Sequence, residues 1–116
     1  MEVDDFLHLE RIVIHNLLHF IIPAVVAWIL YRFKWRKTFF IMILTMLVDL
    51  DHLLADPIFD PDRCGIGFHP LHSWTAILVY CVLLFHPVVR IVGLGLLIHM
   101  ALDGLDCFWM QMERGI

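Results

Sequence analysis

The stretch that decides the fold is MLVDLDHLLADPIFDPDRCGIGFHPLHSW, residues 46–74. It begins as an apolar run suited to a membrane, yet ionisable side chains interrupt that run and follow it. These side chains are Asp49, Asp51, His52, His69 and His72. A carboxylate at the middle of a bilayer costs roughly 2.5–3.5 kcal/mol on insertion scales. The stretch therefore predicts that a compensating interaction stabilises charged groups inside an apolar chain.

The composition of the whole chain indicates one membrane domain, residues 1–116. It is 61% hydrophobic with a mean hydropathy of +0.84, whereas soluble domains are nearer half apolar. The net charge of -4 argues against a nucleic-acid partner. Histidine is the anomaly, because its 8 copies equal Lys and Arg together, and imidazole is the commonest protein metal ligand.

Four apolar segments separated by polar turns predict an all-α, integral-membrane four-helix bundle. The expected spans are residues 12–31, 38–55, 73–86 and 91–110. Twenty residues at ~1.5 Å each can cross a hydrocarbon core of ~30 Å. The third span is short, and Pro87 with Arg90 is a weak turn signal, so one long kinked helix from Ser73 onward is an alternative. Prolines and glycines mark residues 56–72 as the long outer loop.

The cations predict how this bundle lies in the membrane. Four of them fall within RFKWRK, residues 32–37, after the first span, and Arg90 lies between the third and fourth spans. Cytoplasmic loops are enriched in Lys and Arg, so both turns are expected to face the cytoplasm. Both termini and the 56–72 loop then face outward. There Cys64 and Cys107 could form a disulfide in an oxidising compartment.

This topology brings polar side chains from all four segments into one layer in the outer half of the bundle. Three pairs share a helix face at i,i+3 or i,i+4 spacing: His15 with His19, Asp49 with His52, and His99 with Asp103. Helical bundles that hold metals in their cores use such carboxylate–histidine spacings. Asp51 points away from Asp49 on an ideal helix. It is expected to orient a ligand, to lie at a helix end, or to bind after local unwinding.

A divalent cation would neutralise these carboxylates and bind the imidazoles at the same time. Zinc suits a mixed His/Asp set best, and iron or manganese fits the helix spacing as well. The candidate ligands are His15, His19, Asp49, His52, His69, His72, His99 and Asp103. They exceed one tetrahedral site, so one or two ions are expected. The opposing interpretation is a set of interhelical hydrogen bonds, which average only ~0.6 kcal/mol each; His69 and His72 could also be an exposed loop pair.

The motifs VDLDH (48–52), HPLHS (69–73) and HMALD (99–103) occur together in this chain. In this combination they resemble bacterial proteins described as predicted membrane-bound metal-dependent hydrolases, distantly similar to zinc-dependent phospholipase C. A small group of uncharacterised four-helix membrane proteins is the most similar part of that family. The resemblance covers about residues 17–107.

The resemblance implies a metal and catalytic set made of Asp49, Asp51, His52, His69, His72, His99 and Asp103. It also implies a bacterial membrane protein, and the orientation that the cations predict places the site on the periplasmic side of the inner membrane. The chain differs from a soluble phospholipase in size, because 116 residues leave no room for that enzyme's extra helices. The substrate class therefore does not transfer with the resemblance.

The leading functional hypothesis is a membrane metal-dependent hydrolase that acts on a phosphoester or ester. The depth of the site favours a lipid or amphiphilic substrate. A metal-bound water, its pKa lowered toward ~7, would attack the substrate, Asp51 would orient or deprotonate that water, and Arg63 would bind a phosphate. The alternative is a non-enzymatic metal binder, such as a sensor, a carrier or a structural site. A third possibility is an assembly subunit whose polar residues pair with a partner chain, and four short spans also favour a homodimer.

Overall fold

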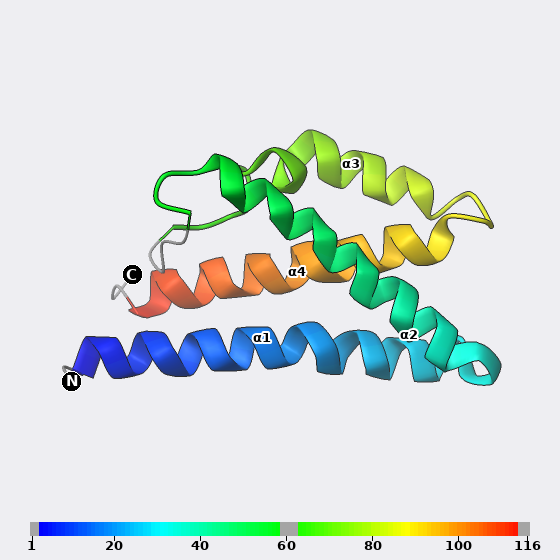
Figure 1. Ribbon diagram of the computed structural model, residues 1–116, viewed down its shortest axis with the longest axis horizontal. Coiled ribbons are helices and arrows are strands. Elements are labelled where there is room, and N and C mark those ends of the chain that lie inside the picture. Colours follow the sequence, from blue (N-terminus) through cyan, green and yellow to red (C-terminus); the bar gives the residue numbers. More distant parts are fainter. Residues whose placement is uncertain (1–2, 59–62, 114–116) are drawn as a thin grey trace.

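The computed structural model describes residues 3–58 and 63–113, and within these ranges the chain is helical and has no strand. Residues 59–62 of the expected outer loop lie outside the described residues. The four main helical segments are α1 (Val3–Leu30), α2 (Trp35–Leu44) with its direct continuation η2 (Thr45–Leu54), α3 (Trp74–Leu83), and α4 (Arg90–Glu113) (Figure 1). Two short 3₁₀ turns, η1 (Arg32–Lys34) and η3 (Pro70–His72), complete the fold.

The predicted all-α fold with four helical segments is confirmed, and the alternative of one long helix after Ser73 is wrong. Ser73 begins α3 as its N-cap, since its Oγ accepts a hydrogen bond from Ala76 N at 3.2 Å. Between α3 and α4 the chain turns, and Arg90 Nε donates to Leu84 O across this turn at 2.8 Å. α1 begins earlier than expected, at Val3, and continues through Pro23.

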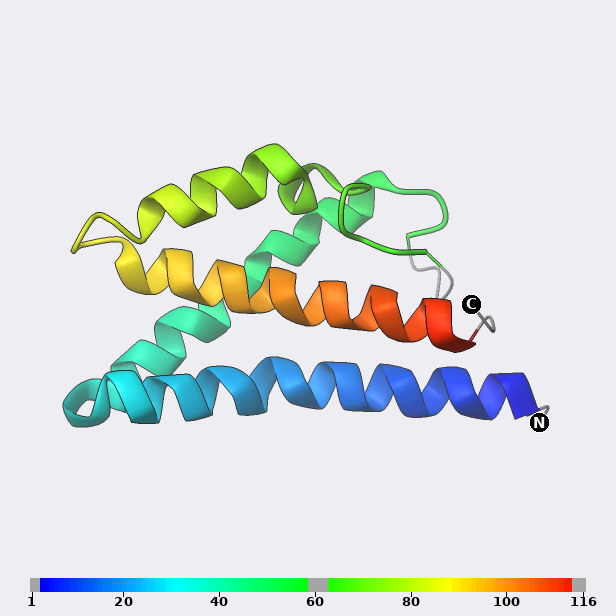
Figure 2. The same cartoon turned by 180° about the vertical axis from the view of Figure 1, so that it is seen from behind.

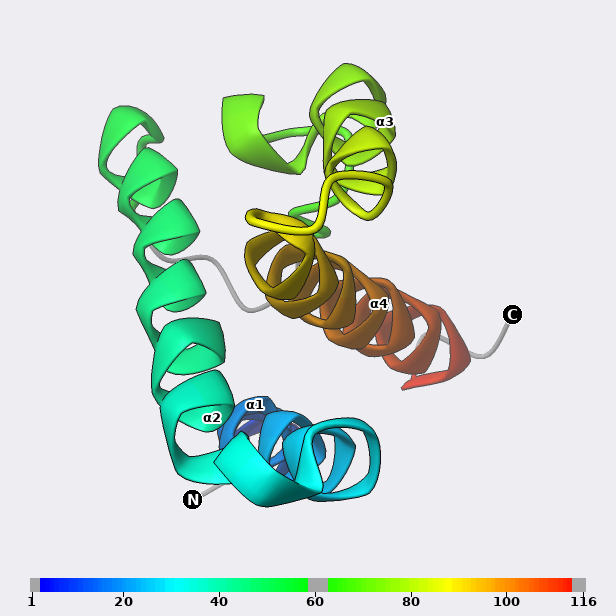
Figure 3. The same ribbon diagram turned by 90° about the vertical axis from the view of Figure 1, so that its right-hand side faces the viewer.

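α4 is the central helix of the bundle. It packs against α1, α2, η2 and α3, and an end-on view shows it between α1 and α3 with α2 beside it (Figure 3). Both termini and the segment after η2 lie at one end of the molecule, whereas the α1–α2 and α3–α4 turns lie at the other (Figures 1 and 2). The predicted up-and-down order is therefore confirmed.

Two glycines allow α4 to approach its neighbours closely. A Cβ at Gly95 would lie 2.9 Å from Thr45 Oγ1 and 3.1 Å from the Met42 Cα. A Cβ at Gly93 would lie 2.9 Å from the Tyr80 backbone oxygen. Small residues at helix crossings let the backbones make extended van der Waals contact, which here fixes α2 and α3 against α4.

The η2 segment turns more tightly than an α-helix, and this change places its acidic residues. In a 3₁₀ helix with three residues per turn, side chains at i and i+3 eclipse one another. Thr45, Val48 and Asp51 accordingly form one buried face. Asp49 and His52 form the neighbouring, partly exposed face. The carboxylate of Asp51 is thus turned into the bundle while that of Asp49 lies at its edge.

The segment after η2 is attached to the bundle at two points. Cys64 forms a disulfide with Cys107 of α4, 43 residues further along the chain, a pairing that the sequence left open. Tyr80 Oη donates a hydrogen bond to Leu71 O at 2.7 Å. Together these contacts hold residues 63–73 against the end of the bundle where the termini lie.

The outer surface of the bundle is strongly apolar. α1 from Leu9 to Leu30 and the whole of α4 are long and apolar enough to cross a membrane, by length and composition. Only 17% and 28% of their most apolar windows are buried inside the molecule. Leu17, Leu50 and Leu53 are each more than half exposed. A monomeric soluble protein rarely exposes apolar surface on this scale.

Candidate metal centre

Four ligand atoms from three parts of the chain meet inside the bundle. They are Oδ1 of Asp49 on η2, Nε2 of His72 in η3, and Nε2 of His99 and Oδ2 of Asp103, both on α4. Five of the six distances among them run from 2.9 to 3.3 Å. The sixth, between the two carboxylate oxygens, is no longer than 4.8 Å. Ligands ~2.0 Å from a tetrahedral zinc lie ~3.3 Å apart, so these five distances match the spacing of a zinc shell.

Hydrogen bonds account for this arrangement only if His72 carries a positive charge. His72 Nδ1 lies 2.9 Å from Asp51 Oδ2, and because a carboxylate accepts, Nδ1 carries the proton. In the neutral ring, His72 Nε2 then has no hydrogen and carries a lone pair. It faces Asp49 Oδ1 at 3.2 Å and Asp103 Oδ2 at 3.0 Å. Acceptors that face one another at this distance need a positive charge between them.

The two loop histidines differ in pKa, and only that of His72 reflects this need for positive charge. Burial lowers the pKa of His72, but hydrogen bonds to Asp103, Asp49 and Asp51 outweigh burial and raise that pKa to about 10. In the absence of a metal, a proton supplies the charge. By contrast, burial and the nearby His52 lower the pKa of His69, so this ring is neutral near pH 7. A divalent cation would displace the proton on His72.

Asp51 orients His72 and does not line the adjoining cavity. Its Oδ2 accepts from His72 Nδ1 and from Leu71 N, both at 2.9 Å. Its Oδ1 lies 3.0 Å from His52 Nδ1. The side chain is buried, and it is not among the residues that line the adjoining cavity. This position fits the expected ligand-orienting role, in which a carboxylate fixes the tautomer of a metal-binding histidine, rather than the role of deprotonating water.

The second oxygen of Asp103 faces the histidines of α1. Asp103 Oδ1 lies 3.2 Å from His15 Nε2 and 3.4 Å from His19 Nε2. The two imidazole rings are neighbours on one face of α1, with centroids 4.3 Å apart. These three residues form a second cluster of potential ligands, and Asp103 belongs to both clusters.

His52 and His69 lie beside the four-atom cluster rather than in it, although His52 forms a further group of potential ligands with Asp49, Asp51 and His72. His52 Nδ1 is 3.7 Å from Asp49 Oδ1, and it is closer to Asp51. The ring of His69 stacks on that of His52 with a centroid distance of 3.8 Å. His69 belongs to none of the ligand clusters formed by the described residues. All eight predicted ligands thus gather in one region, and all of them except His52 and His69 provide atoms of the two clusters that Asp103 joins.

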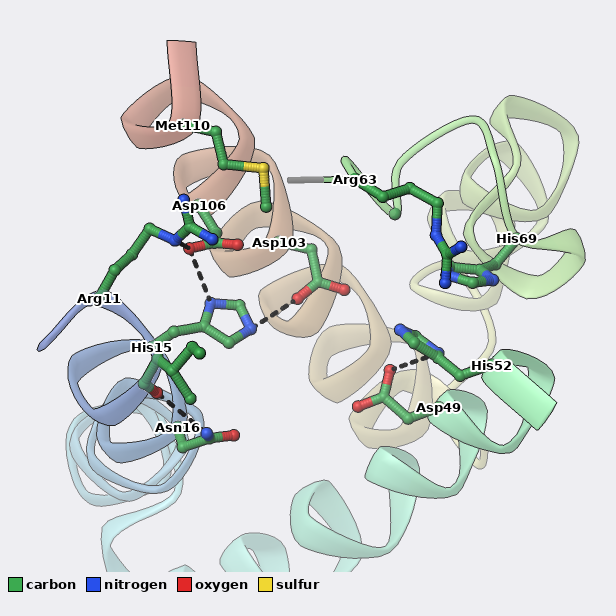
Figure 4. A pocket seen from close by; sticks show the side chains of 12 residues that line it. Arg11, His15, Asn16, Asp49, His52, Arg63, His69, Asp103, Asp106 and Met110 are labelled. Carbon is green, nitrogen blue, oxygen red and sulfur yellow. Dashed lines mark hydrogen bonds and ion pairs between the residues drawn. The ribbon is translucent and has the colours of Figure 1, made fainter. Parts of the chain in front are cut away.

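A polar cavity of about 240 Å³ adjoins both clusters (Figure 4). Asp49 and His52 border it from η2, and His15 and Asp103 border it from α1 and α4. Its complete lining is Arg11, Ile12, His15, Asn16, Asp49, His52, Arg63, Gly65, His69, Asp103, Asp106 and Met110. The Asp49 side chain is 43% exposed, so water in the cavity reaches the edge of the four-atom cluster.

Two arginines border this cavity, and the sequence identified only one of them as a site residue. Arg63 donates from Nη2 to Pro57 O at 2.8 Å, and its guanidinium lies 4.7 Å from the centre of the Phe68 ring. Arg11, which sequence reasoning missed, is almost fully buried and pairs with Asp106 at 3.3 Å and Glu113 at 3.0 Å. Its position one turn before His15 was the available signal.

A family model matches residues 9–110, which include every ligand of both clusters and both bridged cysteines. This chain belongs to DUF6122, a family of unknown function. No curated protein and no solved structure matches the chain. The DUF6122 match carries no activity of its own, so the resemblance to metal-dependent hydrolases stays a prediction. Any function for this DUF6122 member has to be argued from the site itself.

Proposed function

We propose that this protein is a membrane-embedded, metal-dependent hydrolase that acts on a phosphoester or ester of a lipid or similar amphiphile. One observation carries the proposal: two imidazole nitrogens and two carboxylate oxygens, all within 4.8 Å of one another, border a polar cavity open to water. The ligand set would bind a divalent cation in place of the proton on His72, and the cavity would give that cation access to a substrate.

Zinc is the metal that best fits the donor set. Two histidines and two aspartates at near-tetrahedral spacing are typical of Zn²⁺. Iron and manganese accept the same donor types but prefer more ligands. Carboxylates on apolar segments also explain why a metal would stay bound, because removing it leaves Asp49 and Asp103 beside the buried His72 and His99.

The apolar exterior supports insertion in a membrane, with the site near its outer face. The two long apolar helices keep most of their side chains unburied within the molecule. The basic residues of η1 and α2 lie at the end opposite the disulfide. The positive-inside rule assigns that basic end to the cytoplasm. A disulfide at the other end fits an oxidising periplasm, so two independent features favour the same orientation in a bacterial inner membrane.

Side chains of this chain would serve distinct purposes in hydrolysis. A bound metal supplies a Lewis acid and lowers the pKa of water. Asp51 holds His72 in the tautomer that presents Nε2 to the metal. Arg63 lines the cavity, and its guanidinium would attract the anionic oxygens of a phosphoester. Phosphoesters are therefore favoured over neutral esters.

The surroundings of the cavity favour an amphiphilic substrate. The cavity walls are polar where they meet the metal cluster, and Ile12 and Asn16 of α1 form part of its edge. Neighbouring side chains on α1 and η2, including Val13, Leu17 and Leu50, are apolar and exposed. A molecule with a polar headgroup and an acyl tail would place its head at the cluster and its tail along these surfaces.

One observation favours the alternative of a non-enzymatic metal binder. The four-atom cluster already offers four protein ligands, and structural zinc sites are closed by four protein ligands, whereas catalytic sites keep an open position. A sensor or a structural site would use the same residues without turnover. A catalytic role therefore requires either a further coordination position at Asp49 or a second metal.

Hydrolysis of fluorogenic phospholipids by the protein in detergent micelles or proteoliposomes tests the proposal. We expect turnover that a chelator abolishes, that added Zn²⁺ restores, and that is lost in His99→Ala. His86→Ala serves as the matched control, since His86 lies in the α3–α4 turn, at the end away from the site. Metal-loaded protein that turns over neither phospholipids nor simple phosphoesters would favour the non-enzymatic alternative.

A further inference from the structure

The second cluster, formed by His15, His19 and Asp103, has a different character from the first. It offers three ligands rather than four, and two of them, His15 and Asp103, line the cavity. We infer that this cluster is a second, exchangeable metal position, bridged to the four-ligand position by the Asp103 carboxylate. The inference rests on the proposed function, which it deepens by naming the ion that meets the substrate.

The hydrogen bonds of His19 support this assignment. Its Nδ1 lies 2.8 Å from the His15 carbonyl oxygen, and because a carbonyl only accepts, Nδ1 carries the proton. His19 is 4% exposed. Its Nε2 is buried without a hydrogen-bond partner among the described residues, and it faces Asp103 Oδ1 at 3.4 Å. A lone pair that faces a carboxylate oxygen in a buried site is the arrangement that a cation between them would relieve.

His15 completes the cluster from the adjacent turn of α1. Its Nε2 lies 3.2 Å from Asp103 Oδ1. Its Nδ1 lies 4.0 Å from Asp106 Oδ1, which also lies 3.3 Å from Arg11 Nε. Asp106 therefore places a carboxylate near His15 Nδ1, at a distance longer than a hydrogen bond.

Asp103 is shared by the two positions, because each of its carboxylate oxygens faces one of them. Its Oδ2 faces His72 and His99 at 3.0 and 3.2 Å, whereas its Oδ1 faces His15 and His19. Carboxylate-bridged metal pairs in hydrolytic sites lie ~3.5–4 Å apart. With three protein ligands, a metal at the second position would have a coordination site free toward the cavity, as catalytic zinc sites do. The buried four-ligand position would retain its ion more tightly than this one.

Metal content measured by mass spectrometry on the protein in detergent, after saturation with Zn²⁺ and gel filtration, tests the inference. We expect two equivalents per wild-type chain, one in the double variant His15→Ala/His19→Ala, and one in His15→Ala alone. The single variant guards against misfolding, because His15 is only partly buried. The matched control His86→Ala should keep two. Co²⁺ titration provides a second readout, with two successive d–d spectra in wild type and one in the His15→Ala/His19→Ala variant.

The outcomes separate this inference from the proposed function. One equivalent in wild type that survives the loss of His15 and His19 but not of His99 would overturn the second position and leave the first intact. Such a result would mean that a proton on His19 Nε2, rather than a metal, faces Asp103. No retained metal in wild type would overturn both.

Discussion

Replacement of Asp51 by asparagine should weaken metal binding without touching a metal ligand. Asp51 makes three contacts: its Oδ2 accepts from His72 Nδ1 and Leu71 N, and its Oδ1 lies 3.0 Å from His52 Nδ1. An amide keeps only one oxygen. If that oxygen stays on Leu71 N and His72, the contact with His52 is lost; if it turns, His72 loses the acceptor that fixes its tautomer.

Loss of a carboxylate partner behind a metal-binding histidine lowers metal affinity ~10–100-fold, which corresponds to ~1.4–2.7 kcal/mol. We therefore expect the zinc dissociation constant of Asp51→Asn to rise by one to two orders of magnitude, measured by competition with a fluorescent chelator in detergent. Glu10→Gln is the matched control, because Glu10 is an exposed carboxylate of α1. If Asp51→Asn binds zinc as tightly as wild type and the control, the assigned role of Asp51 is refuted.

Three further perturbations follow from the structure. Replacing Cys64 and Cys107 by serine removes a disulfide between residues 43 positions apart. The loop-closure entropy of the unfolded chain corresponds to a stabilisation of ~4 kcal/mol, so the variant should unfold in detergent at a lower denaturant concentration. An unchanged unfolding midpoint would contradict the disulfide. Gly95→Ala should destabilise the fold by ~1–3 kcal/mol, because the added Cβ would lie 3.1 Å from an atom of α2. The control Gly104→Ala should leave stability unchanged, because its Cβ would meet nothing within 4 Å. Equal melting temperatures of the two variants would contradict the close helix crossing at Gly95. The metal-free protein should lose stability as pH rises from 6.5 toward 10. Folding raises the pKa of His72 to about 10, so the stabilisation from its protonated form is complete below pH 6.5 and lost above pH 10. The metal-loaded protein should instead lose stability on acidification, and parallel profiles of stability against pH for both forms would contradict this.

The order of the helices was predictable from the sequence because it depends on apolar length and charge. The four-residue spacing of His99 and Asp103 likewise predicted that both side chains share one face of α4. The spacing of residues along one helix, however, does not determine how that helix is rotated relative to its neighbours. That the two oxygens of Asp103 face different histidine pairs could not be read from any single segment.

The loop histidines show a second limit of sequence reasoning. His69 and His72 flank the same proline, and nothing in their spacing distinguishes a ligand from a neighbour. The structure distinguishes them through contacts far apart in sequence: Leu71 N donates to Asp51, and Tyr80 donates to Leu71 O. These contacts turn His72 into the cluster and leave His69 stacked on His52.

Asp51 and Arg11 show the same dependence on local geometry and distant contacts. An ideal α-helix would have turned Asp51 away from the cluster, and the tighter η2 segment instead places it directly behind His72. Arg11 pairs with Glu113, 102 residues away. Pairings at that separation leave no periodic signal in one sequence.

X-ray absorption at the K-edge of the retained metal tests the central claim most directly. For the zinc-loaded wild-type protein we expect nitrogen and oxygen ligands at ~2.0–2.1 Å, with imidazole scattering that falls when both His72 and His99 are replaced by alanine. An imidazole signal that persists in that double variant, or a protein that takes up no divalent metal at all, would contradict the account.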